Sequence, residues 1–251
     1  MTTYYYISPQ LWAWNTKRVK IIQQCIKRIF VIFPFEKQFY QKYNVEATYI
    51  GNPLVSKIDN FINQQLKIEK EKDYILLLPG SRIQEVSRNL HIMLELSKRF
   101  PEQNFVIGGL SIIPKSLYKE DNLPPNVTVQ YENTYPLLKN ATIAIVTSGT
   151  ATLETALFGV PQIVVYRSDW FSFLIAKMLI KVPFISIVNL IAGKEIVKEL
   201  IQNDFNTLNL EIELKKLLIS EDKHYFDYYK NQLIVHNGVK NAAWEIISFI
   251  P

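Results

Sequence analysis

A Ser-Gly-Thr turn offers the clearest ligand chemistry in this sequence. Ser148, Gly149 and Thr150 follow the apolar run Ile143–Val146, and Glu154 comes four residues after the turn. Glycine lets a ligand approach the backbone closely, and the free amide groups in the first turn of a helix favour an anion. A carboxylate on the same helix accepts hydrogen bonds from two adjacent sugar hydroxyls, so the pattern predicts a nucleoside diphosphate site. The competing interpretation is an ordinary helix that Ser148 or Thr150 caps, with Glu154 on a solvated face.

A second turn, earlier in the chain, supplies an arginine. The unbroken apolar run Tyr74–Leu78 predicts a buried strand, and Ser81 and Gln84 have the spacing of a capping box that starts a helix at Ser81. Arg82 then stands in the first helical turn, where its guanidinium adds a forked donor for a phosphate. The sequence supports equally well a surface arginine that pairs with Glu85.

A third polar group comes late in the chain. Asn189, Gly193 and Glu195 predict another helix start, and the Asn189 amide can both donate to and accept from a nucleotide or a sugar. The alternative is a loop residue that satisfies its own backbone.

The most apolar window lies between residues 170 and 193. Lys177 and Lys181 interrupt it, and burying both lysines at bilayer depth is expensive. The window therefore predicts a buried helix followed by an apolar loop, and a surface that touches a membrane or an acyl chain is the functional alternative. The tail from Leu208 onward has a helical pattern.

The elements that position these turns form an α/β pattern. Five short apolar strands, around residues 76, 106, 128, 144 and 164, alternate with helices and predict a complete Rossmann-like domain. Three earlier strands, Tyr4–Ile7, Ile29–Phe33 and Ala47–Ile50, predict only part of a second domain, because so small a sheet cannot bury both faces. The charged stretch Lys67–Asp73 reads as the linker. The expected domains are residues 1–66, 67–220 and 221–251, the last being helices that pack back on the first part.

Composition narrows the class of protein. With 251 residues, 48% hydrophobic and 20% charged, the chain is an ordinary globular protein, and its net charge of +5 suits an anionic partner. The single cysteine, Cys25, excludes an internal disulfide and is expected in the core, and no secretory signal opens the sequence. Neither a GxGxxG nor a Walker motif is present, which weakens dehydrogenase and P-loop ATPase interpretations. The three histidines are scattered, so no metal or other cofactor is expected.

One helix near the start is strongly basic. Lys17, Arg18, Lys20, Lys27 and Arg28 surround its apolar stripe. A solvated polar face is favoured over a lipid-surface patch.

Six sequence blocks, in order and spacing, resemble the lipid-A-disaccharide synthase family. The blocks are Tyr6–Trp14, Pro34–Glu36 with Phe39 and Tyr40, Ile50–Leu54, Leu78–Val86, Ser148–Glu154 and Asn189–Glu195. The resemblance implies a GT-B glycosyltransferase that transfers diacylglucosamine, with inversion, from UDP-2,3-diacylglucosamine to 2,3-diacylglucosamine 1-phosphate. It also implies a donor site and no metal, with Arg82 and Asn189 as catalytic residues. The implied donor-site residues are Arg82, Ser148, Gly149, Thr150, Glu154, Asn189 and Glu195.

The resemblance also implies where the enzyme works and what it lacks. A peripheral position on the cytoplasmic face of the bacterial inner membrane is expected, with no nucleic acid as partner. The family pattern begins before this chain does, so most of the acceptor site and the acidic general base are expected to be missing. A separately encoded amino-terminal half or a second copy is then the expected protein partner. Two alternatives remain: another UDP-sugar GT-B enzyme, such as a peptidoglycan glucosaminyltransferase or an epimerase, and a non-catalytic UDP-sugar-binding subunit.

Overall fold

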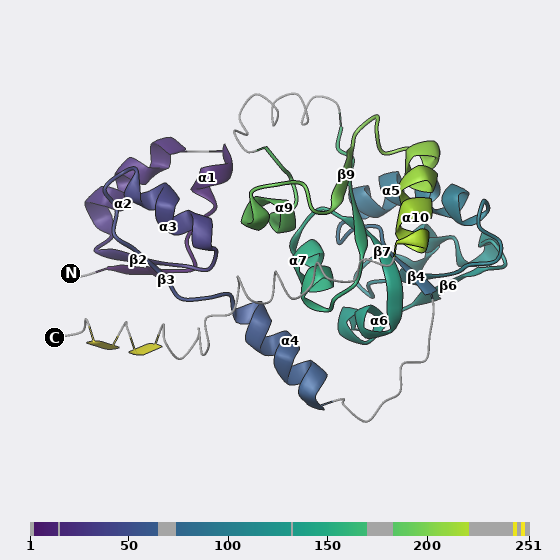
Figure 1. Ribbon diagram of the computed structural model, residues 1–251, viewed down its shortest axis with the longest axis horizontal. Coiled ribbons are helices and arrows are strands. Elements are labelled where there is room, and N and C mark those ends of the chain that lie inside the picture. Colours follow the sequence, from purple (N-terminus) through teal and green to yellow (C-terminus); the bar gives the residue numbers. More distant parts are fainter. Residues whose placement is uncertain are drawn as a thin grey trace. The chain divides into compact units, whose positions relative to one another are not determined.

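The structure is a computed structural model that describes residues 3–14, 16–64, 74–131, 133–169, 183–220, 243–244 and 247–248 (Figure 1). The chain divides into two compact units. Unit 1 is built mainly from the described residues up to Asn63, and unit 2 from those within Gln64–Asp169 and Phe184–Phe226. The expected domain boundaries after residues 66 and 220 adjoin ranges outside the described residues, so they stay predictions.

The described residues of unit 1 include three parallel strands in the order β1-β2-β3. The strands are β1 (Tyr4–Tyr6), β2 (Arg28–Val31) and β3 (Ala47–Tyr49), with Tyr5 opposite Ile29 and Phe30 opposite Thr48. The helices are α1 (Leu11–Trp14), the 3-10 helix η1 (Thr16–Arg18), α2 (Val19–Cys25), α3 (Pro34–Gln41) and α4 (Pro53–Gln64). Apolar side chains from β2, α2 and α3 share one core. The three predicted strands are confirmed, with ends that differ by one or two residues.

A buried carboxylate closes the start of α3. Glu36 is 1% exposed and accepts hydrogen bonds from the backbone amides of Ile32 (3.1 Å) and Phe33 (3.0 Å). It also accepts from the Ser8 hydroxyl (3.1 Å) and the Trp12 indole (3.2 Å), which lie in the segment after β1. Burial raises the pKa of the Glu36 carboxyl, and the four hydrogen bonds oppose that shift. Glu36 therefore joins two chain segments at the carboxyl ends of neighbouring strands.

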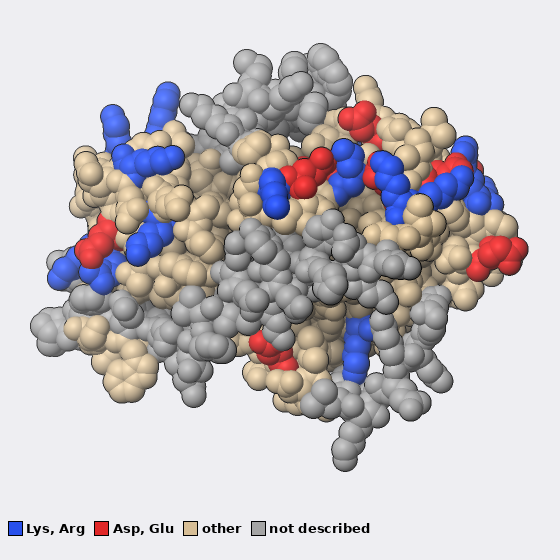
Figure 2. Space-filling model, viewed as in Figure 1, with Lys and Arg blue, Asp and Glu red and all other residues tan. Residues whose placement is uncertain are grey.

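The surface around α2 corrects one expectation and leaves another open. Cys25 is exposed, because α2 ends there and the buried stripe consists of Val19 and Ile22. Lys17, Arg18, Lys20 and Lys27 are exposed, and Arg28 pairs with Glu46. Figure 2 shows basic side chains predominating over the visible face of unit 1. Exposure is what both a solvated face and a lipid-surface patch require, so the favoured interpretation stays a prediction.

Unit 2 contains six parallel strands in the order β6-β5-β4-β7-β8-β9. The strands are β4 (Tyr74–Leu78), β5 (Asn104–Gly108), β6 (Val127–Gln130), β7 (Ala141–Thr147), β8 (Gln162–Tyr166) and β9 (Lys198–Ile201). The helices are α5 (Ile83–Ser97), α6 (Thr134–Asn140), α7 (Thr150–Leu157), α9 (Ile187–Ala192) and α10 (Thr207–Ile219), with the 3-10 helices η2 (Lys115–Tyr118) and η3 (Glu120–Asn122). Numbered within the unit, this order is 3-2-1-4-5-6, which is that of a Rossmann fold.

Helices cover both faces of this sheet. Ile75 and Leu77 of β4 belong to a core that includes residues of α5 and α10, whereas Leu76 and Leu78 belong to a second core that includes residues of α6. Successive side chains of a strand point to opposite faces, so an unbroken apolar run is what a doubly covered strand needs. The Rossmann-like prediction for this part of the chain is confirmed.

Three local predictions for unit 2 are wrong. The sheet has a sixth strand, β9, which sequence did not indicate because Leu200 is its one fully buried residue. Helix α5 starts one residue later than expected, with Arg82 as N-cap and Glu85 in place of Gln84 as the capping carboxylate. Of the residues expected at a helix start, only Asn189 lies in the first turn of α9, because this helix starts after Ser186 and ends at Gly193 in a left-handed conformation (φ 67°), so that Glu195 lies beyond its end.

The remaining predictions fall partly outside the described residues. Most of the apolar window, residues 170–182, and most of the tail after residue 220 belong to that category. Among the helices that the structure does describe, none has the length and apolar character to cross a lipid bilayer.

Candidate functional site

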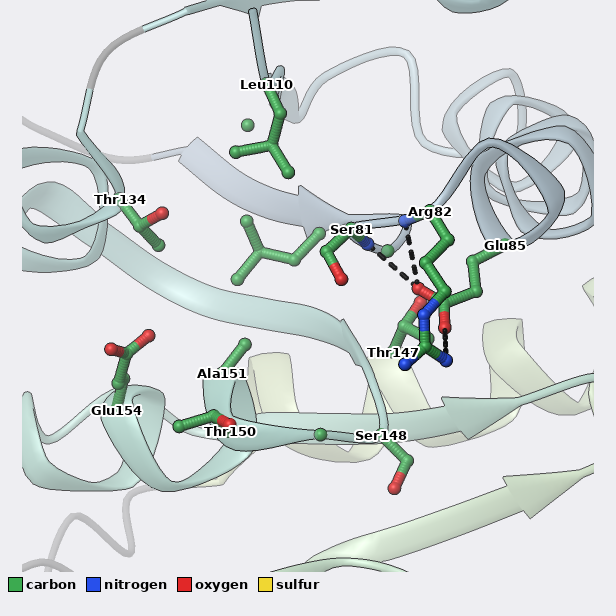
Figure 3. Close-up of a pocket in the computed structure, with 14 residues that line it drawn as sticks. Ser81, Arg82, Glu85, Leu110, Thr134, Thr147, Ser148, Thr150, Ala151 and Glu154 are labelled. Carbon is green, nitrogen blue, oxygen red and sulfur yellow. Dashed lines mark hydrogen bonds and ion pairs between the residues drawn. The ribbon is translucent and has the colours of Figure 1, made fainter. Parts of the chain in front are cut away.

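A pocket of about 460 Å³ lies in unit 2 at the carboxyl ends of β4, β5 and β7 (Figure 3). Its walls come from the turn between β4 and α5, the end of β5, the start of α6 and the turn between β7 and α7. Strand order reverses between β4 and β7, and open α/β sheets bind ligands outside the carboxyl ends of the strands at such a switch point. The fold therefore places this pocket where a ligand is expected.

The start of α7 is open toward the pocket. Gly149 is the N-cap, and no side chain caps the helix. The Ser148 hydroxyl donates instead to the Ile185 carbonyl (3.0 Å), and the Thr152 hydroxyl donates to the Gly149 carbonyl (2.8 Å). A Cβ atom added at Gly149 would meet nothing within 4 Å, so the space in front of the turn is free. The capping alternative from sequence does not hold, and this helix start keeps its capacity for an anion.

Arg82 lines the same pocket from the opposite turn. Its side chain is 82% exposed and pairs with Glu85 at 3.4 Å, as Figure 3 shows. Exposed pairs of this kind contribute only about 0–1 kcal/mol, so a phosphate can recruit the guanidinium at small cost. Glu85 also accepts from the backbone amides of Ser81 (2.9 Å) and Arg82 (3.3 Å). The sequence left two roles open for Arg82, a phosphate donor or a surface ion pair with Glu85. The structure contains the ion pair, and both of its residues line the pocket.

Gly80 is required for that capping arrangement. Its φ is +132°, a conformation that other residues rarely adopt. A Cβ atom there would lie 2.4 Å from the Glu85 Cβ and 2.7 Å from its Oε2. Glycine thus lets Glu85 fold back over the turn that carries Arg82.

Asn89 connects the two turns beneath the pocket. Its side chain is completely buried, and its Nδ2 donates to the Pro79 carbonyl (2.9 Å) and to the Thr147 hydroxyl (3.0 Å). Pro79 follows β4 and Thr147 ends β7, so one amide fixes the separation of the pocket's two walls. Sequence reasoning missed Asn89, although a polar residue between Val86 and Leu90 on the buried stripe of α5 is a usable signal.

Glu154 lies at the far end of the pocket on α7. The Tyr135 hydroxyl donates to its Oε1 at 3.3 Å, and both side chains come from helices that flank the pocket. Burial, and then the neighbouring carboxylate, raise the pKa of Tyr135 to about 12, so the phenol stays protonated as a donor. Figure 3 shows the Glu154 carboxylate and the Thr134 hydroxyl at this end of the pocket. A carboxylate can accept hydrogen bonds from two adjacent hydroxyl groups.

The structure does not bring Asn189 and Glu195 into the pocket. Asn189 is completely buried, and its side-chain amide forms hydrogen bonds with Ile196, Val197 and Glu199. Glu195 forms an exposed ion pair with Lys198 (3.1 Å). Of the predicted donor-site residues, Arg82, Ser148, Gly149, Thr150 and Glu154 line one pocket. Within the described part of the chain, no three His, Cys, Asp or Glu side chains gather as a metal site would need.

Comparison with known proteins identifies the family of this chain. The family model described as Lipid-A-disaccharide synthetase matches residues 1–245. Lipid-A-disaccharide synthase of Idiomarina loihiensis is 33% identical over 258 residues, covering 98% of this chain and 67% of the relative. The enzymes of the same name from Acinetobacter baylyi (36%) and Sulfurihydrogenibium sp. (37%) are matched over 87% and 92% of this chain, and over 61% and 65% of their own lengths. The chain thus spans about two thirds or less of these curated relatives.

Solved structures with the same fold act on nucleotide sugars or transfer sugars. UDP-GlcNAc 2-epimerase from Neisseria meningitidis, bound to UDP-GlcNAc, superposes with a TM-score of 0.58 at 15% identity, covering 96% of this chain and 66% of that one. The calicheamicin glycosyltransferase CalG4 has a TM-score of 0.61 at 14% identity, covering 93% and 56%. At this identity the likeness establishes the GT-B-like α/β fold alone. The family match is the stronger finding, and on it the chain belongs to the Lipid-A-disaccharide synthetase family.

Proposed function

We propose that this chain binds the UDP-sugar donor in lipid-A-disaccharide synthesis. The proposed donor is UDP-2,3-diacylglucosamine, the acceptor is 2,3-diacylglucosamine 1-phosphate, and the reaction takes place at the cytoplasmic face of the bacterial inner membrane. One observation carries the proposal: the uncapped start of α7 and the Arg82 guanidinium line the same pocket at the switch point of the sheet. Family membership selects the sugar and the acceptor among the anions that such a site can hold.

The pocket's residues suit a leaving diphosphate. In the proposed transfer, the bond between the anomeric carbon and the β-phosphate oxygen breaks, a bond to the acceptor's 6-oxygen forms, and the hydroxyl proton leaves to a base. Negative charge grows on the departing UDP. The first-turn amides of α7 are fixed donors for that charge, and the Arg82 guanidinium is a second donor in the same pocket. Donors that point at a developing charge stabilise the transition state more than the ground state. Glu154 is the proposed acceptor for the ribose hydroxyls.

Isothermal titration calorimetry with UDP tests the donor site without requiring turnover. We expect saturable binding with one UDP per chain, and stronger competition by UDP-2,3-diacylglucosamine than by UDP-N-acetylglucosamine. Equal competition by the two sugars would favour another UDP-sugar enzyme of the same fold. An absence of UDP binding by the folded chain would overturn the proposal. Binding is measured, so the result is independent of whether a second copy or a further polypeptide completes the acceptor side.

A further inference from the structure

A hydrogen-bonded route leads from the pocket to the edge strand β9. The Ser148 hydroxyl, at the pocket turn, donates to the Ile185 carbonyl (3.0 Å). The amide of the same residue, Ile185, donates to Oε2 of Glu199 on β9 (2.9 Å). Ile185 thus stands between the turn and a carboxylate that does not line the pocket.

Glu199 accepts three more hydrogen bonds on its other oxygen. The donors to Oε1 are the Ser186 amide (3.0 Å), the Ser186 hydroxyl (2.8 Å) and Nδ2 of Asn189 (2.8 Å). Ser186 and Asn189 are completely buried. Four donors on one carboxylate, two of them successive backbone amides, hold the backbone at Ile185 and Ser186 in one orientation.

Asn189 completes the same assembly from α9. Its Nδ2 also donates to the Val197 carbonyl (2.9 Å), and its Oδ1 accepts from the amides of Ile196 (2.7 Å) and Val197 (3.0 Å). Both amide hydrogens and both oxygen lone pairs of this side chain are therefore in use. Helix α9 packs against α7, whose first turn forms the pocket wall. Asn189 therefore holds α9 and the start of β9 together next to the helix that forms the pocket wall.

We propose that Glu199 is a positioning residue for the nucleotide site. It fixes the Ile185 carbonyl, which orients Ser148, and through Ser148 it holds the turn whose amides bind the diphosphate. The inference rests on the proposed function, because it assigns Glu199 a role at that same site. It differs from a purely structural role, because the loss must appear in UDP affinity and must pass through Ser148.

The test compares UDP affinity and thermal stability in two single variants and their double variant. Glu199→Gln keeps the side chain's length and one oxygen but turns an amide group toward donors, so the Ile185 backbone is released. Ser148→Ala removes the hydrogen bond to Ile185 and leaves Glu199 intact. Each change is expected to weaken UDP binding about tenfold, which corresponds to about 1.4 kcal/mol. Because both break one route, the double variant is expected to lose little more than either single variant.

Glu102→Gln is the matched control, because Glu102 is exposed in the same unit and the charge change is the same. It is expected to bind UDP as the unsubstituted chain does. Unchanged UDP affinity in folded Glu199→Gln, or fully additive losses in the double variant, would overturn the inference. If Glu199→Gln fails to fold, the test rests on Ser148→Ala. Unchanged UDP affinity in Ser148→Ala would then overturn the inference. Failure of the unsubstituted chain to bind UDP overturns the proposed function instead, so the two failures are distinguishable.

Discussion

Helices α3 and α7 both start directly after a parallel strand, and they satisfy their first-turn amides in opposite ways. In unit 1, Glu36 at the third position of α3 accepts from two backbone amides and is almost completely buried. In unit 2, the third position of α7 is Thr152, whose hydroxyl points back to the Gly149 carbonyl. The first turn of α3 therefore has its own capping carboxylate, whereas the first turn of α7 has no capping side chain and faces the pocket.

The difference shows how a helix start becomes a binding site. First-turn amides carry a partial positive charge and need an acceptor, which can be a capping side chain, water or a bound anion. Helix α5 is intermediate, because Glu85 caps it while Arg82, at the same turn, remains exposed to the pocket. Omitting the carboxylate at α7 leaves room for a ligand phosphate, and the following predictions test that comparison.

Glu36→Ala is expected to have the largest effect, on stability. It leaves two backbone amides, a hydroxyl and an indole without their acceptor, in sites that water reaches poorly. The expected loss is about 3–5 kcal/mol, confined to unit 1. Hydrogen exchange measured by mass spectrometry should show faster exchange in β2 and α3, with β4 and α5 unchanged.

Glu46→Ala is the matched control for that experiment. Glu46 pairs with Arg28 and its side chain is 64% exposed, so the change should cost less than about 1 kcal/mol. Similar losses in the two variants would mean that the Glu36 carboxylate does not close α3 as argued.

Sequence was enough to predict the framework that carries the pocket. Apolar runs such as Tyr74–Leu78 are buried on both faces, and a glycine follows each of the strands β4, β5 and β7 that border the pocket, so local pattern and tertiary role agree there. The sequence does not predict the edge strand β9, because a strand at the edge of a sheet needs few apolar residues. Arg82 is predicted within one residue of its observed position and Gly149 at its observed turn, and both line one pocket because parallel strands end at the same edge of the sheet.

The supporting residues could not be predicted in the same way. Asn89 and Glu199 act across 58 and 14 positions of sequence, on Thr147 and Ile185, and no local pattern encodes such distances. Asn189 shows the converse: its side chain can bind a nucleotide, and burial next to β9 commits it to backbone groups instead. Residue chemistry indicates what a side chain can do, and tertiary placement selects among those possibilities.

Gly149→Asp turns the open helix start into a closed one. Aspartate is a preferred N-cap, the backbone at Gly149 is extended, and its Cβ would meet nothing within 4 Å. Stability of unit 2 should stay the same or rise by a few tenths of a kcal/mol, while UDP affinity falls about a hundredfold, or about 2.7 kcal/mol. Gly149→Ala, which adds no charge, should lose much less affinity in the same titration. Equal UDP affinity in the aspartate variant and the unsubstituted chain would exclude the α7 amides as the diphosphate site.

Arg82→Ala tests the exposed side-chain donor of the same anion site, where the expected effect is smaller. The guanidinium is 82% exposed and its pair with Glu85 is weak. The free energy of unfolding, measured by urea denaturation, should therefore change by less than about 0.5 kcal/mol. UDP affinity should fall about tenfold, since one charge-assisted donor is lost. Raising the salt concentration should narrow the gap between variant and parent, because exposed charges are screened. Arg99→Ala is the control: Arg99 pairs with Glu211 away from the pocket, and its loss should leave UDP affinity unchanged. If both arginine variants lose affinity alike, general surface charge attracts the nucleotide and the pocket geometry of Arg82 does not.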